Sequence, residues 1–443
     1  MRAGASETVI TPLQGAWLLG SLQRNTGTHD DLFARALVLD DGQRSVAIVC
    51  LDLPGLDIDF NDDLVDAIVE RTQVDQVLIN CSHTHSAPFT IPWSSGFERH
   101  RNEEHEWREN LLNTIPTLVA SITLQPVTLE AAHAPVQIGT NRRRRKGAEV
   151  HMEPNPDDVT DQRVDVLIVR DLSNEILAIL YSHAAHPVIV HASSSTISAD
   201  YPGAAATRIR ALLGDQVVPL FAQGCCGNIN ADPWRGGHAK ADAAGYRLGS
   251  AVVQAIDQAL AIPDPSIDFV SHTITLPCQA LPSRDQIAMK ILDVEARRNS
   301  ADPADAMELW RCDDILSALQ DVTAMIAGGR SPAARHEINA LFLGSQWTII
   351  TMPHEPFFEY TEAIRATVPS RHGMVWGYTN GCETYVPTDA ALREGLGYEA
   401  SGFPNLGSAA LKYPLRAPLA PGAEEAIRNT LDKIFSDNRA ANS

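Results

Sequence analysis

Apolar residues recur along the first half of the chain in two alternating patterns. Short apolar runs predict largely buried strands, and a longer segment at 59–72 has the spacing of an amphipathic helix. A second helical segment at 103–124 contains Pro116, which is expected to kink or split it. Strands that alternate with helices in this way favour an α/β fold. The predicted strands are residues 32–41, 45–56, 75–85, 163–171 and 175–187.

The second half of the chain continues the same alternation. It contains no internal repeat, coiled coil or low-complexity tract, and no linker rich in Pro, Gly or Ser divides it from the first half. We therefore expect a single large domain over residues 1–443, with mixed β-sheets flanked by helices and a helical excursion at about 283–328. The predicted elements here are a strand at 216–224, a β-hairpin at 337–356, and helices at 239–261, 283–299, 303–328 and 422–436.

Composition and charge narrow the classes of partner. The chain has 443 residues, of which 44% are hydrophobic and 20% are charged, as in an ordinary globular protein. Its formal net charge of -20 argues against binding to the backbone of a nucleic acid or to an anionic membrane surface. No apolar stretch reaches the length of a membrane span. A small molecule is therefore the expected partner, and the sequence leaves a homo-oligomer open.

The cysteines and the first residues bear on cellular location. Seven cysteines are scattered along the chain without CxxC spacing, which favours reduced thiols over a disulfide framework or a cysteine zinc site. The N-terminal segment lacks a basic stretch followed by a long apolar run, so no signal peptide is evident. Together these observations predict a cytoplasmic protein.

Four polar loops each follow a predicted buried strand. Active sites in α/β architectures gather at the C-terminal ends of strands, so we expect these loops to converge on one site. The loops cover residues 82–88, 183–191, 224–232 and 353–356.

The loop NCSHTHSAP places His83 and His85 two residues apart. Side chains at positions i and i+2 of a strand point to the same face, so the two imidazoles would share one small volume. That pattern fits a metal site, a metal ligand beside a proton shuttle, or two polar residues that close a strand. The segment SHAAHPVIVH adds three histidines at a second strand end and favours metal binding. Glu355, held between two prolines that suit a fixed ligand, adds a carboxylate, although on composition alone an exposed loop glutamate is the better explanation.

Taken together, these loops resemble those of a known family. The motifs NCSHTHSAP, NRRRR, AHPV…ISADYPG, FAQGCCGNINAD, TMPHEPF and ETYVPT…GYEAS occur in the order found in the neutral (non-lysosomal) ceramidases and their bacterial relatives. Each motif alone is weak, whereas six in the same order are a strong signal. The resemblance extends from about residue 6 to about residue 412. It implies the catalytic domain of a zinc-dependent amidohydrolase.

The resemblance also implies roles for individual residues. His85 falls on the family's catalytic histidine, Arg142 on an arginine near the substrate, and Tyr398 on a tyrosine that hydrogen-bonds an oxyanion. Catalytic zinc usually takes histidine and carboxylate ligands and activates water. The implied ligands of Zn2+ are His83, His186, Glu355 and Tyr385.

Two features depart from the ceramidase pattern. Ceramidases carry a serine, needed for their activity, where this chain has Asn230. An asparagine can donate or accept hydrogen bonds but cannot act as a nucleophile, which favours attack by metal-activated water. No segment here corresponds to the C-terminal immunoglobulin-like domain of many ceramidases, and aromatic residues make up only 6% of the chain. Both points favour a substrate that is smaller and more polar than a sphingolipid.

Three functional hypotheses follow. The leading one is a zinc-dependent hydrolase of a C–N amide bond in a small or polar substrate. The second is a metal-dependent enzyme that acts on a C–O bond in an ester, lactone or glycoside, because the loop with Asn230 faces the reacting group in ceramidases. The third is a non-catalytic, metal-stabilised binding protein, and the retained site residues argue against it. The run of positive charge at 142–146 fits either a solvated turn or binding of an anionic substrate group.

Overall fold

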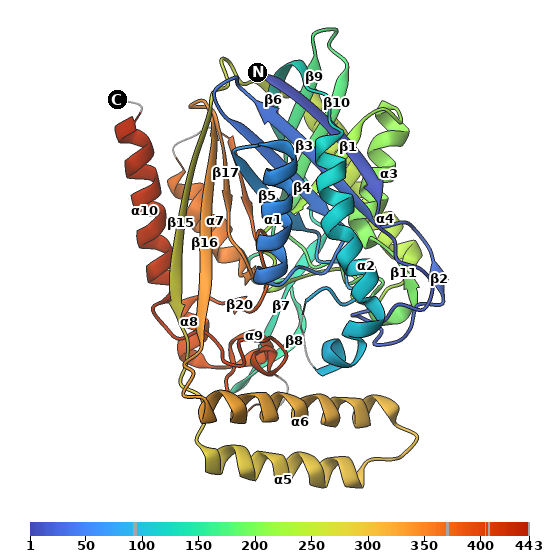
Figure 1. The fold of residues 1–443 in the computed structure, drawn as a ribbon, viewed down its shortest axis with the longest axis vertical. Coiled ribbons are helices and arrows are strands. Elements are labelled where there is room, and N and C mark those ends of the chain that lie inside the picture. Colours follow the sequence, from blue (N-terminus) through green and yellow to red (C-terminus); the bar gives the residue numbers. More distant parts are fainter. Residues whose placement is uncertain (92–94, 369–371, 404, 406–407, 442–443) are drawn as a thin grey trace.

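Two β-sheets pack against each other in the centre of the structure, and helices cover the outer faces of both (Figure 1). Leu37 and Leu180 of the larger sheet meet Leu341, Ile349 and Trp376 of the smaller sheet in one shared apolar core. This arrangement confirms the predicted α/β fold of mixed sheets flanked by helices. The computed structural model describes residues 1–91, 95–368, 372–403, 405 and 408–441.

The larger sheet has nine strands in the order β12-β10-β9-β6-β1-β3-β4-β5, and β14 pairs with β6. β4 and β5 are parallel, as are β10 and β12, whereas the other neighbours are antiparallel. The bounds are β1 Arg2–Val9, β3 Phe33–Asp40, β4 Ser45–Leu51, β5 Gln76–Cys81, β6 Gln125–Pro135, β9 Arg163–Asp171, β10 Ile176–His183, β12 Val218–Gln223 and β14 Leu260–Ala261. Every strand predicted in the first half of the chain is therefore present.

The first and last strands of this order, β12 and β5, lie beside each other at their C-terminal ends. The side-chain oxygen of Asn80 in β5 accepts the backbone N–H of Gln223 in β12 at 2.7 Å. The Asn80 amide donates back to the carbonyl oxygen of Gln223 at 3.3 Å. These two hydrogen bonds bring the loops after β5 and β12 to one place.

The smaller sheet has the order β15-β16-β17-β19, with β17 and β19 parallel. It includes the predicted hairpin, whose strands are β16 and β17. Helices α7 and α10 cover its outer face, where Ile364 of α7 and Ile427 and Leu431 of α10 are buried. The bounds are β15 Ile267–Pro277, β16 Ala333–Leu343, β17 Trp347–Thr351, β19 His372–Trp376, α7 Phe358–Thr367 and α10 Ala423–Ala441.

Four helices cover the outer face of the larger sheet. α1 (Ile58–Thr72) and α2 (Ser95–Ala120) pack on β3, β4 and β5, while α3 (Asp200–Leu213) and α4 (His238–Ile256) pack on β9, β10 and β12. α2 continues past Pro116, so the predicted split of this helix does not occur. A proline removes one backbone hydrogen bond from a helix. Burial of Leu111, Ile115 and Leu118 on either side of Pro116 keeps the helix packed on the sheet.

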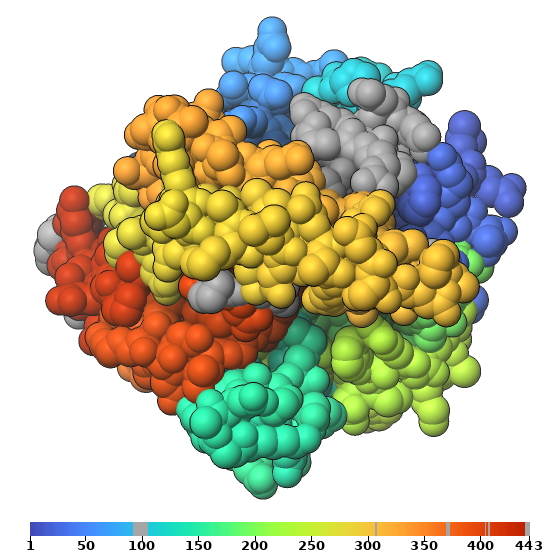
Figure 2. Space-filling view, turned by 90° about the horizontal axis from the view of Figure 1, so that it is seen from below, coloured from blue at the N-terminus to red at the C-terminus, as the bar shows by residue number. Residues whose placement is uncertain are grey.

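The helices α5 (Arg284–Ser300) and α6 (Ala306–Ala327) form an antiparallel pair in the segment that connects β15 to β16 (Figure 1). A capping box between Ser283 and Gln286 starts α5, and Ile287 and Val294 pack on α6 in a small core of their own. Figure 2 shows this helical pair, in yellow and light orange, lying across the middle of the lower face of the molecule.

Shorter elements surround the polar loops. β7, β8 and β13 make a three-stranded sheet, and β18 pairs with β20. No helix in the described residues is long and apolar enough to cross a membrane, and all seven cysteines have free thiols. The bounds are β2 Gly27–Thr28, β7 Gly139–Lys146, β8 Glu149–Asn155, β11 Thr196–Ile197, β13 Ile229–Ala231, β18 Glu355–Pro356, β20 Tyr385–Val386, α8 Asp389–Glu394 and α9 Gly397–Ala400.

Candidate metal centre

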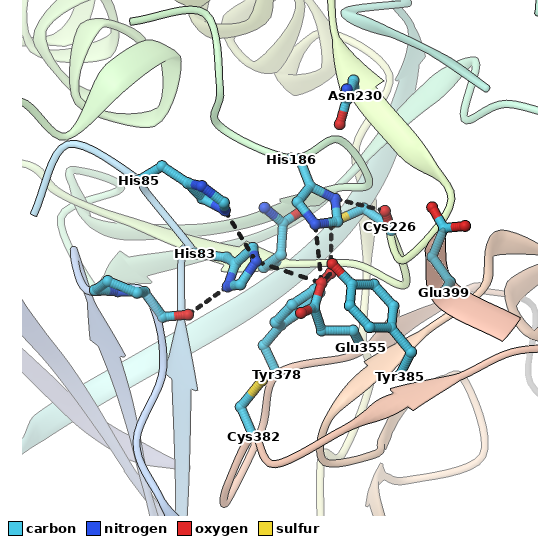
Figure 3. Close-up of polar contacts among 12 residues, drawn as sticks. His83, His85, His186, Cys226, Asn230, Glu355, Tyr378, Cys382, Tyr385 and Glu399 are labelled. Carbon is cyan, nitrogen blue, oxygen red and sulfur yellow. Dashed lines mark hydrogen bonds and ion pairs between the residues drawn. The ribbon is translucent and has the colours of Figure 1, made fainter. Parts of the chain in front are cut away.

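Three imidazoles and one carboxylate meet where the four polar loops converge (Figure 3). Ligand atoms of His83, His85 and His186 all lie within 4.8 Å of one another. Oε2 of Glu355 is 2.9 Å from Nε2 of His186 and 3.4 Å from Nε2 of His83. Nε2 of His85 is 3.3 Å from Nε2 of His83. The predicted convergence of these loops is therefore present in the fold.

Backbone carbonyl groups orient the imidazoles of His83 and His186. Nδ1 of His83 hydrogen-bonds the carbonyl oxygen of Pro54, and Nδ1 of His186 lies 2.7 Å from that of Cys226. A carbonyl oxygen only accepts, so each Nδ1 carries a proton and Nε2 is the nitrogen that faces Glu355. The contact of Oε2 with both Nε2 atoms requires positive charge between them, which a proton or a metal ion supplies. Two imidazole nitrogens and a carboxylate oxygen suit a divalent metal such as zinc.

A sharp turn, rather than a strand face, brings His83 and His85 together. β5 ends at Cys81, and His83 has a φ of 67°, in the left-handed region that costs a residue with a side chain about 1–2 kcal/mol. The prediction that both histidines lie on one face of a strand is therefore wrong. Their imidazoles still meet beyond the left-handed residue His83, with the two Nε2 atoms 3.3 Å apart.

Short backbone pairings place the other site residues in register. Glu355 in β18 is paired directly with Tyr385 in β20. His186 is bridged to Asn230, and its N–H donates to the carbonyl oxygen of Ile229 at 2.9 Å. Because these residues are fixed through backbone hydrogen bonds, their side chains start from defined positions.

Arg142 links two other predicted residues, Asn230 and Tyr385, and the additional residue Glu399 into one buried network. Its guanidinium donates to Oδ1 of Asn230 at 2.9 Å, to the hydroxyl of Tyr385 at 3.1 Å and to Oε1 of Glu399 at 2.8 Å. The ring of Tyr398 lies 5.7 Å from that of Tyr385, centroid to centroid. The structure thus brings together all eight residues singled out from the sequence.

Two further tyrosines contact Glu355 directly. The hydroxyl of Tyr378 donates to Oε2 at 3.1 Å, and that of Tyr413 donates to Oε1. In contrast, the hydroxyl of Tyr385 accepts a hydrogen bond from Arg142. Sequence reasoning missed Tyr378 and Tyr413 because no local pattern in "WGYTNG" or "LKYPLR" marks them.

Burial and neighbouring charges set the protonation of the centre. Burial alone would raise the pKa of the Glu355 carboxyl, but His83 and His186 outweigh it and hold this pKa well below its ordinary value. Burial lowers the pKa of His186 to about 4, with Arg142 adding to the effect. Burial likewise lowers the pKa of His85 well below its ordinary value, helped by His83 and His191. At neutral pH, these carboxylate and imidazole groups are in the states that bind metals.

A cavity of about 620 Å³ lies over this centre. Seven of the eight predicted site residues line it, and His186 is buried behind them. The α5–α6 pair supplies another part of the wall, including Trp310 and Ile315, and Trp234 stands nearby. The site is therefore a pocket that opens to solvent on one side, with apolar as well as polar walls, and is sized for a small molecule.

The fold and the site define an α/β protein with a buried candidate metal centre at the ends of its sheet strands. No family model matches the chain, and no curated protein matches it. Its fold is nevertheless that of the neutral ceramidases. The neutral ceramidase of Pseudomonas aeruginosa is 16% identical, with a TM-score of 0.66 over 97% of this chain and 73% of that one. The structure of a ceramidase complexed with C2 is also 16% identical, with a TM-score of 0.67 over 97% of this chain and 74% of that one.

Proposed function

We propose that this protein is a zinc-dependent hydrolase that cleaves a C–N amide bond with activated water. The observation that carries the proposal is the convergence of two Nε2 atoms and a carboxylate oxygen at a cavity of about 620 Å³. The fold shared with structures described as ceramidases supports amide hydrolysis over other metal-assisted reactions.

In this proposal His83, His186 and Glu355 hold the zinc ion and Tyr385, paired in register with Glu355, is the fourth ligand. When bound, the ion supplies Lewis-acid activation of water and of the amide carbonyl. Tyr378 and Tyr413 hold both oxygens of Glu355 and so fix the direction of its carboxylate.

His85 is the proposed proton-transfer group. Its depressed pKa keeps the imidazole neutral at pH 7, so Nε2 can accept a proton from the attacking water. The same nitrogen then returns that proton to the leaving amine. His85 lines the cavity beside His83, which puts it within reach of both steps.

Arg142 and Tyr398 are the proposed stabilisers of the tetrahedral oxyanion. Burial raises the pKa of the Tyr398 hydroxyl, which therefore stays protonated and able to donate. Asn230 holds the guanidinium of Arg142 through Oδ1 and so positions it. An amide side chain offers no nucleophile, which supports water as the attacking group.

Replacement of serine by Asn230 also favours a second candidate, a metal-dependent enzyme for C–O bonds. The two candidates separate on a panel of matched amides, esters, lactones and glycosides, assayed with chelated and zinc-loaded protein. We expect amide cleavage that chelation abolishes and zinc restores. Cleavage confined to C–O bonds would favour the second candidate, and full amide turnover with metal confirmed absent would sink the proposal.

A further inference from the structure

The cavity over the candidate metal centre has the opposite charge to the chain as a whole. The formal net charge of the chain is -20. The described residues that line the cavity nevertheless include more basic side chains than carboxylates. The basic ones are Arg142, Arg235, Arg297, Arg311 and Lys412, and the acidic ones are Asp314 and Glu355.

Protein carboxylates already engage three of these cations. Arg142 is paired with Glu399 at 2.8 Å, and Nη2 of Arg297 donates to Glu308 at 2.9 Å. Asp314 acts on the buried ammonium of Lys412 and opposes the lowering of its pKa by burial. These three cations therefore have their main charge partner within the protein.

Three more basic residues of the run at 142–146, for which the sequence left open binding of an anionic group, are also paired with carboxylates. Arg143 contacts Glu399 at 2.7 Å, Arg145 contacts Glu394 at 2.6 Å, and Lys146 contacts Glu153 at 2.5 Å. All three lie in β7 rather than in a loose turn. These contacts do not support binding of a substrate anion by Arg143, Arg145 or Lys146.

Arg235 and Arg311 differ from these cations, because no described carboxylate lies within hydrogen-bond distance of either guanidinium. Arg235 makes no ion pair with any described residue, and its guanidinium lies 4.3 Å from the ring centroid of Trp234. The nearest carboxylate to Arg311 is Glu308 at 3.9 Å, which Arg297 already engages. Burial, and after it the charge of Arg311, lowers the pKa of the Arg235 guanidinium. Both guanidinium groups line the same cavity, where an anion would meet two positive charges that no described carboxylate neutralises closely.

The backbone holds Arg235 in place before any ligand arrives. Its φ of 58° fixes a left-handed turn, and its N–H donates to the carbonyl oxygen of Val188 at 3.1 Å. Arg311 stands on α6, a regular helix. The backbone positions of both arginines are therefore defined, while their exposed side chains become ordered only when they bind an anion.

Two rows of aromatic rings lead away from the metal centre along the cavity. On one wall His85 is followed by His191 at 5.1 Å and then by Trp234 at 6.1 Å, ring centroid to ring centroid, and Arg235 lies over the Trp234 ring. On the other wall Tyr398 follows Tyr385 at 5.7 Å, and the ammonium of Lys412 lies 5.2 Å from the Tyr398 ring. Arg235 is therefore set off from His85 by two rings, within the span of one small molecule, and Arg311 lines the same cavity.

We propose that the substrate is an amide that carries an oxyanion group, which Arg235 and Arg311 bind while the amide lies over His83 and Glu355. A guanidinium pair recognises the paired oxygens of a carboxylate or a phosphate. An N-acylated amino acid is the simplest such molecule, and the apolar side chains Trp310 and Ile315 give its acyl chain a surface to pack on. The identity of the bond rests on the proposed function, whereas the oxyanion site stands on these contacts alone.

The test measures binding to metal-free protein, so that it does not depend on turnover. Calorimetry compares N-hexanoylglycine with its neutral N-methylamide, and inorganic phosphate is titrated as a third probe. We expect the wild-type protein to prefer the carboxylate by about tenfold or more, the size of a charge-assisted pair of hydrogen bonds. In Arg235→Met and Arg311→Met this preference falls toward one, and Arg235→Lys restores part of it. Tight binding of phosphate in place of the carboxylate would assign the site to phosphate-bearing amides.

A matched control is Arg428→Met, which removes an exposed arginine of α10 that is paired with Glu424 at 3.3 Å, outside the cavity lining. It is expected to keep the wild-type preference. Equal affinity of wild-type protein for the charged and neutral probes, or the same loss in Arg428→Met, overturns the oxyanion site. Turnover of the same two amides by zinc-loaded protein is measured in parallel. Charge-selective binding without amide cleavage refutes the proposed function alone, whereas cleavage of both amides at equal rates refutes the oxyanion site alone.

Discussion

Replacement of Glu355 by glutamine tests the metal centre with the smallest change in shape. Oε2 of this residue faces Nε2 of both His83 and His186, so Glu355→Gln removes the negative charge that opposes the ion. A complete zinc site contributes about 10–16 kcal/mol, or about 3 kcal/mol for each of four ligands. Loss of one ligand should therefore weaken zinc binding by about 100-fold.

The same substitution should change the metal-free protein much less. Glutamine keeps the volume of the side chain and one oxygen for the hydroxyls of Tyr378 or Tyr413. An NH2 group replaces the other oxygen and can only donate, which costs about 1–2 kcal/mol for one lost hydrogen bond. Removal of a buried charge offsets part of that cost. We expect the free energy of unfolding without metal to change by less than about 2 kcal/mol.

The assay combines zinc competition with a chromophoric chelator and urea unfolding with and without zinc. Glu359→Gln is the matched control, because Glu359 is a half-buried carboxyl on the next helix whose Oε2 accepts the Asn228 amide at 2.8 Å. It should bind zinc as the wild type does. Wild-type zinc affinity in Glu355→Gln, or an equal loss in both variants, would refute the assignment of Glu355 as a ligand.

Three further outcomes are expected. His85→Gln should lower kcat by about 10²–10⁴-fold, as loss of a proton-transfer group does, while zinc affinity stays near that of the wild type. An unchanged kcat would contradict proton transfer by His85. Arg142→Met should cost about 3 kcal/mol in urea unfolding, since it leaves buried Glu399 with Arg143 alone, and a double-mutant cycle with Glu399→Gln should show coupling rather than additivity. Burial raises the pKa of the Asp200 carboxyl from 3.8 to about 7, so its contribution to stability is complete below pH 3.8 and is lost as pH rises through about 7. The free energy of unfolding in urea should therefore decline between pH 5 and 7, as part of a total loss of up to about 4 kcal/mol over the full range. Asp200→Asn should flatten this decline. Parallel pH profiles of the wild type and Asp200→Asn would argue against this titration.

The sequence predicted the elements whose pattern is local. The apolar runs that became β3, β4, β5, β9, β10 and β12 were recognisable because both faces of these strands are covered, by helices on one side and the smaller sheet on the other. β7 was not foreseen, because its run of arginines has no apolar pattern. Its charges are instead matched by glutamates about 250 residues away along the chain, at Glu394 and Glu399.

The candidate site likewise combines residues that the sequence predicted with residues that only the fold revealed. Its histidines and Glu355 lie in motifs that resemble a known family, so they could be singled out before the fold was seen. The shared location of His83 and His85 was expected for the wrong reason, since a left-handed turn and not a strand face produces it. Tyr378 and Tyr413 reach Glu355 only through the fold, and no signal in their neighbours along the chain marks them.

The central claim is metal-dependent cleavage of an amide, and one titration tests it most directly. Metal-free protein is titrated with Zn2+ while hydrolysis of short-chain and long-chain N-acyl amides is followed, with bound zinc measured in each sample. The account predicts no cleavage without metal and a rise in rate that ends at one zinc per chain. Full turnover by protein shown to contain no metal, or no amide cleavage at any zinc content, would contradict it.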